Sequence, residues 1–109
     1  MGGSEAAVPR PVTRFTVVVL PEAEADLREA FLWYFDRSPL AADAFGNEVT
    51  DAINGLEETA ADWPKDEDGV HFYHLKRFPH TVRYEIAGNE VTVLAVGHQR
   101  RQPRYWKHR

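Results

Sequence analysis

Cysteine is absent from the 109 residues of this chain. Disulfides, thiolate metal sites and a thiol nucleophile are therefore excluded. Long hydrophobic runs are also absent: the longest near the start, Val17–Leu20, is only strand-sized, and a membrane span needs about 20 residues. Residues 1–7 contain neither the basic region nor the apolar region of a signal peptide. We therefore expect neither secretion nor a membrane partner.

Apolar residues make up 43% of the chain and aromatic residues 12%, which is enough for a hydrophobic core. The length allows one domain. The first twelve residues contain two glycines, two prolines and a serine, but no periodic apolar pattern. We expect a flexible leader over residues 1–12 and a single domain over residues 13–109, with a basic tail at residues 98–109.

Charge is divided unevenly along the chain, whose formal net charge is −4. Residues 1–69 hold fifteen acidic and five basic side chains, a net of −10, whereas residues 70–109 hold two acidic and eight basic ones, a net of +6. All five histidines also lie in the second part. This asymmetry indicates an anionic partner or an acidic peptide. The alternative is that the helices carry solvated acids and the tail is basic without a partner.

Local patterns in the first part predict one strand and two helices. Residues 13–20 are rich in β-branched side chains and indicate a strand. A helix over residues 21–37 follows, with Pro21 at its first position. Ser38 is the expected N-cap of a second helix that ends near Asp62. The short connection between the helices predicts an antiparallel hairpin.

From residue 71 onward the pattern changes to strands, which we expect over residues 71–78, 81–87 and 90–97. Gly88 and Asn89 form a two-residue turn signal between the last two strands. The element order is therefore β-α-α-β-β-β. It predicts an α+β fold in which the antiparallel helix hairpin packs on one face of a small, mostly antiparallel sheet.

Counting outward from this turn gives the register of the last two strands. Tyr84 should face Val93 and Val82 should face Ala95, forming an apolar surface under the helices. The opposite face should then hold Arg83, opposite Leu94. Continuing by twos from Leu94 places His98 at the rim of this same face.

Two residues of that face are candidates for chemistry. Arg83 could clamp an anion or a carboxylate through its bidentate donors; alternatively, it pairs with Glu85 or extends over an open sheet face. His98 could be a general acid or base, or a hydrogen-bonded strand end. The spacing of His71, His74 and His80 matches no zinc pattern, so we expect no metal and no cofactor.

The tail combines five Lys and Arg residues with Tyr105 and Trp106 and contains no acid. Basic residues interleaved with aromatic ones can follow a phosphate backbone and stack on bases. The alternative is a short C-terminal element in which Tyr105 and Trp106 pack on the core and arginines pair with acids of the helices.

Three segments carry a family resemblance: Ala23-x-x-Asp26-Leu27, Leu75–Ile86 and Val91–Trp106. Together with the element order, they make residues 14–106 similar to RelE/ParE-type toxins of bacterial toxin–antitoxin systems. The resemblance implies a small cytoplasmic toxin that a cognate antitoxin neutralises. RelE-like members cut mRNA in the ribosomal A site, whereas ParE-like members inhibit DNA gyrase.

The resemblance also assigns residues. Arg83 matches the arginine of the family's central strand, and Tyr105 lies near the position of a nuclease tyrosine. If the chain is a nuclease, the implied catalytic residues are Arg83, His98 and Tyr105. The residues implied in target or antitoxin binding are Lys76, Arg77, Arg83, Arg100, Arg101, Arg104 and Trp106.

Two features favour the ParE-like branch. The predicted strand at residues 71–78 contributes only Lys76 and Arg77, fewer cations than the lysine-rich RelE version. The sequence pI of about 5.7 is low for a protein that binds ribosomes. We therefore expect a gyrase inhibitor that is not an enzyme, with an mRNA endonuclease as the alternative. A second alternative is an attenuated, non-toxic scaffold that binds only its antitoxin.

Overall fold

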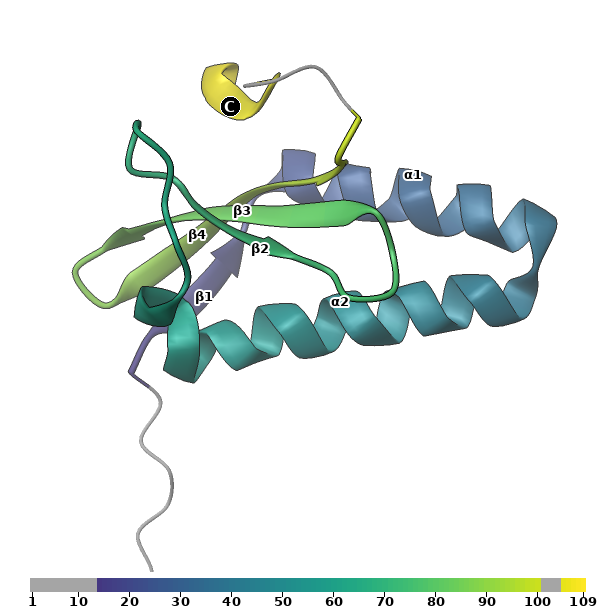
Figure 1. The fold of residues 1–109 in the computed structure, drawn as a ribbon, viewed down its shortest axis with the longest axis horizontal. Helices are drawn as coiled ribbons and strands as arrows, with labels where there is room; N and C mark the ends of the chain where they lie inside the picture. Colours follow the sequence, from purple (N-terminus) through teal and green to yellow (C-terminus); the bar gives the residue numbers. More distant parts are fainter. Residues whose placement is uncertain (1–13, 101–104) are drawn as a thin grey trace, which may run out of the picture.

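The computed structural model describes residues 14–100 and 105–109. Within them the elements follow the predicted α+β order (Figure 1). The elements are β1 (Thr16–Val19), α1 (Pro21–Arg37), α2 (Pro39–Thr59), the 3₁₀ turn η2 (Ala60–Asp62), β2 (His71–His74), β3 (His80–Ala87), β4 (Glu90–His98) and the 3₁₀ turn η3 (Tyr105–His108). The expected leader and two of the predicted basic residues, Arg101 and Arg104, lie outside the described residues.

The two helices form the predicted antiparallel hairpin, lying side by side in Figure 1. Pro21 occupies the first turn of α1, where its missing N–H is not needed. The hydroxyl of Ser38 caps α2 by accepting a hydrogen bond from the Ala41 N–H at 3.2 Å. The α-helix ends at Thr59, and η2 completes the predicted stretch to Asp62.

The four strands form one sheet in the order β1-β4-β3-β2. β1 runs parallel to β4, whereas the other two pairs are antiparallel. The main core lies between the sheet and the helices, where Phe45, Val49 and Leu56 of α2 pack against Tyr84 and Val93. A second cluster on the opposite face consists of Val70, Leu94, Ala95 and Trp106. Figure 1 shows η3 on this side of the sheet, away from α2.

The predicted register holds from the turn as far as Tyr84 opposite Val93 and is wrong beyond that pair. Arg83 faces Ala95 instead of Leu94, and Val82 faces Val96, because β4 carries an extra residue at a β-bulge. Val96, and not Ala95, therefore joins the core under the helices.

The bulge also moves His98. The prediction that His98 lies on the same sheet face as Arg83 is wrong. In the observed register His98 pairs with His80, and the centroids of their two rings are 5.3 Å apart. Alternation by twos cannot detect an inserted residue, so the error carries to the end of the strand.

The strand predicted over residues 71–78 ends at His74. The loop that follows is held by α2, since the carboxylate of Glu48 accepts hydrogen bonds from the Lys76 N–H at 2.6 Å and the Arg77 N–H at 3.2 Å. These two N–H groups therefore bond to a helix side chain instead of a strand.

Candidate functional site

Arg83 lies in the middle of β3, on the sheet face opposite the helices. Its guanidinium carbon is 4.0 Å from the centroid of the Trp106 ring and 5.8 Å from that of Phe72. The side chain is half-buried, and this burial lowers the pKa of Arg83, against the smaller opposing influence of Tyr105 and Asp66. Among the described residues, no ion pair joins Arg83 to Glu85. Arg83 thus stacks on Trp106 and lies near Phe72.

The C-terminal element, residues 105–109, covers this face. Trp106 is 7% exposed and packs on Leu94 and Ala95 of the bulge. The ring of Tyr105 lies directly on Gly97, where a Cβ atom would overlap the phenol oxygen. Only glycine leaves room for this approach. Tyr105 and Trp106 pack on the sheet, as the alternative interpretation of the tail predicts.

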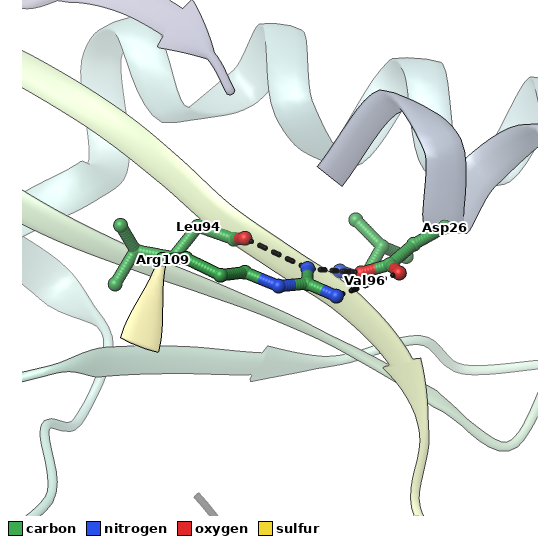
Figure 2. Close-up of polar contacts among 4 residues, drawn as sticks. All are labelled: Asp26, Leu94, Val96 and Arg109. Carbon is green, nitrogen blue, oxygen red and sulfur yellow. Dashed lines mark hydrogen bonds and ion pairs between the residues drawn. The ribbon is translucent and has the colours of Figure 1, made fainter. Parts of the chain in front are cut away.

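The same element is joined to α1 through Arg109 (Figure 2). Arg109 donates to both carboxylate oxygens of Asp26, at 2.6 and 3.1 Å, and also to the Leu94 carbonyl oxygen at 3.1 Å. The Val96 N–H donates to Asp26 at 3.1 Å. The bidentate contact raises the pKa of Arg109, and Asp26 is 8% exposed. The pairing of a tail arginine with a helix acid is therefore confirmed.

The three predicted nuclease residues, Arg83, His98 and Tyr105, border one small cavity of about 120 Å³. Thr81, Gly97, Gln99 and Trp106 complete its lining. His98 is exposed, and its Nδ1 accepts a hydrogen bond from the Arg100 N–H at 3.0 Å, so the neutral ring carries its proton on Nε2. The structure thus brings these side chains to one place despite the altered register.

The other predicted basic residues lie apart from this cavity. Lys76 and Arg77 are exposed in the loop between β2 and β3 and border a different cavity of about 350 Å³, which is also lined by Glu48 and Asp51. The Arg77 guanidinium lies 3.6 Å from Glu48. Arg100 is exposed directly after β4. The predicted binding residues are therefore distributed over two places.

A larger groove of about 700 Å³ runs along α1. Leu32 and Trp33 on its wall are 55% and 52% exposed, and Glu29 and Asp36 add two carboxylates. Its lining contains no Lys or Arg among the described residues. The remaining lining residues are Asp26, Ala30, Tyr34, Pro79, His80, Val96, Gly97 and His98.

His80 is buried in the lining of this groove, and its Nδ1 has no hydrogen-bond partner among the described residues. Burial first, and then the neighbouring His98, lower the pKa of His80 to about 4. His80 is therefore neutral at physiological pH.

Sequence reasoning missed this groove and the role of Asp26. The exposed apolar positions of α1 were the available signal for the groove. The partners of Asp26 are 70 and 83 residues away in the chain, and no local pattern connects them. No group of three or more His, Asp or Glu side chains suited to a metal ion occurs in the part of the chain that the structure describes. The described helices include none long and apolar enough to cross a membrane.

Comparison with known proteins finds a matching family model and several similar solved structures. The family model described as "ParE toxin of type II toxin-antitoxin system, parDE" matches residues 17–103. A solved structure titled "Chromosomal ParDE TA system from P. aeruginosa" is similar with a TM-score of 0.70 and 20% sequence identity, covering 79% of this chain and 97% of its own. No curated protein sequence matches.

Proposed function

Because the chain belongs to the family of ParE toxins of type II toxin–antitoxin systems, we propose that it arrests bacterial growth by inhibiting DNA gyrase and that a cognate antitoxin neutralises it. The proposed place of action is the cytoplasm. The inhibition is by binding, without a catalysed reaction.

The cavity beside Arg83 carries this proposal. Its volume of about 120 Å³ is below the roughly 300–1,000 Å³ of ordinary ligand sites. The guanidinium of Arg83 lies against Trp106, which is 7% exposed. A nucleotide therefore has little room to reach Arg83, whereas the outer surface of the C-terminal element remains available to a protein.

Exposed cations around this element are suited to target binding. Arg100 is exposed after β4, and Lys107 of η3 pairs with Asp68 at 3.4 Å while remaining 41% exposed. Arg83 contributes by supporting the element through its contact with Trp106. The proposed contact set is otherwise that predicted from the sequence: Lys76, Arg77, Arg100, Arg101 and Arg104.

The groove along α1 is the surface we propose for the antitoxin. It combines exposed Leu32 and Trp33 with the carboxylates of Glu29 and Asp36, and its lining has no Lys or Arg among the described residues. Charge complementarity therefore favours an antitoxin segment that carries apolar and basic side chains. The Trp33 ring can accept a guanidinium, since that of Arg37 stacks on it at 3.6 Å from the ring centroid.

A supercoiling assay tests the gyrase proposal. Purified toxin should inhibit gyrase, and Arg100→Ala should weaken inhibition. The matched control Arg28→Ala removes an exposed arginine from α1 and should keep full inhibition. Undiminished supercoiling by gyrase in the presence of wild-type toxin would reject the proposal.

The clustering of Arg83, His98 and Tyr105 around one cavity favours a second candidate, a ribosome-dependent mRNA endonuclease. There Arg83 would stabilise the charged phosphate and His98 or Tyr105 would transfer protons. This candidate requires cuts in phase with codons after induction that disappear in Arg83→Ala. Normal growth together with tight antitoxin binding would instead indicate the attenuated scaffold.

A further inference from the structure

One carboxylate, that of Asp26, joins three separate parts of the molecule. Its Oδ2 accepts hydrogen bonds from the Val96 N–H of β4 and from Arg109, and its Oδ1 accepts the second hydrogen bond from Arg109. Side-chain exposure is 7% for Asp26 and 13% for Arg109. A charged, bidentate pair that is largely removed from water is stronger than a surface ion pair.

The pair also contacts the bulge. Arg109 donates to the carbonyl oxygen of Leu94, the extra residue of β4 between the pairs Tyr84–Val93 and Arg83–Ala95. Leu94 and Ala95 are the residues on which Trp106 rests. The Asp26–Arg109 pair therefore holds the strand segment that supports Trp106 as well as the chain beyond it.

The C-terminal element has little stability of its own. η3 is a single 3₁₀ turn of four residues, and such short turns depend on tertiary contacts. Trp106 stacks on Arg83 and Tyr105 packs on Gly97, while Lys107 pairs with Asp68. Arg109, the residue after η3, binds Asp26. Loss of the Arg109 contact removes the bidentate link between this element and α1.

We propose that Asp26 is a positioning residue for the C-terminal element: by holding Arg109, it keeps Trp106 on Arg83 and fixes the surface that meets the target. The role of this surface in binding the target rests on the proposed function. The positioning itself is a property of the isolated protein.

The first test measures position directly. In the full-length protein, Asp26→Asn and Arg109→Gln should both shift the indole N–H resonance of Trp106 in an NMR spectrum. Glu24→Gln removes an exposed acid from the same turns of α1 and should leave that resonance in place. Arg109→Gln keeps Asp26 and its bond to Val96, so it tests the pair even if Asp26→Asn fails to fold. An unchanged Trp106 resonance in Arg109→Gln would overturn the proposal.

The second test separates positioning from stability. Asp26→Asn and Arg109→Gln should each raise the toxin concentration for half-inhibition of gyrase about tenfold, and the double variant should add little, because both remove one interaction. Val49→Ala, a core change chosen to lower thermal stability, should retain inhibition at temperatures where it is folded. Equal losses in Val49→Ala, or additive losses in the double variant, would overturn the proposal. If the wild-type toxin leaves gyrase active, the proposed function fails and the Trp106 resonance still decides the positioning.

Discussion

At the scale of single residues, three positions of the site make close contacts that limit which side chains they can carry. Gly97 is covered by Tyr105, Arg83 is stacked on Trp106, and Asp26 binds both Arg109 and Val96. Arg83 could be singled out from the sequence as an arginine in a central strand. The partners of Asp26 could not be predicted, because its burial and its hydrogen bonds to distant residues have no local sequence pattern.

Gly97→Ala should destabilise the protein by about 1–3 kcal/mol, since the new methyl group overlaps the Tyr105 phenol and the ring must move. Gly55→Ala is the matched control. Nothing lies within 4 Å of a Cβ atom at that position of α2, so this change should stabilise the helix by up to about 1 kcal/mol. Urea unfolding of both variants measures the change in unfolding free energy. Equal changes for Gly97→Ala and Gly55→Ala would contradict the prediction.

His80 should make stability depend on pH. Its pKa is about 4 in the folded protein and about 6.5 when unfolded. Between these values the unfolded chain binds more protons, so the free energy of unfolding should fall as pH is lowered from about 6.5 to 4, by at most about 1.4 kcal/mol per pH unit. Above pH 6.5 the contribution is fully present and constant.

His80→Phe keeps an aromatic ring but cannot titrate, and it isolates this effect from the protonation of carboxylates. Unfolding free energies of wild type and variant should diverge between pH 7 and pH 5, with the wild type losing more. Parallel curves over that range would show that the burial of His80 has no such effect.

At the scale of elements, the sequence predicts the helices well and the strand register only partly. The stripe Phe45, Val49 and Leu56 of α2 is buried, and Ser38 caps that helix, because both signals are local. The register of β3 and β4 fails at the bulge, and β2 is shorter than expected because Glu48 binds the following backbone. Both departures depend on contacts made after the chain folds.

The groove along α1 allows a prediction about antitoxin binding. Trp33→Ala should weaken the toxin–antitoxin complex by about 2 kcal/mol or more, the effect of truncating an aromatic anchor. Phe35→Ala is the matched control, because Phe35 is 49% exposed on the same helix but does not line the groove. Calorimetric titration of both variants with the purified antitoxin gives the comparison. Equal weakening by both changes would place the antitoxin elsewhere.

At the scale of the whole molecule, the charge division separates the helices from three of the four strands. The acidic part, residues 1–69, contains both helices, and the basic part, residues 70–109, contains β2, β3, β4 and the C-terminal element. A basic partner and an acidic partner can therefore bind separate surfaces of one small domain.

This arrangement predicts that the antitoxin complex is sensitive to salt. Raising ionic strength from 0.1 to 1 M shortens the screening length from about 10 to 3 Å. Affinity for the antitoxin should fall, and Glu29→Gln with Asp36→Gln should flatten the dependence, since both carboxylates line the groove. Calorimetry at the two salt concentrations measures this. An affinity that is independent of salt would argue against a basic antitoxin segment.

The Asp26–Arg109 pair has a further consequence for the sheet. β1 accompanies β4 only as far as Val93, where the Leu20 N–H bonds to its carbonyl oxygen. Beyond that point Arg109 takes the carbonyl oxygen of Leu94 and Asp26 takes the N–H of Val96. An edge strand with unpaired backbone groups is a template for another chain. Two side chains thus bind backbone groups at the edge that a short β1 leaves open, so these groups are not available for pairing with another strand.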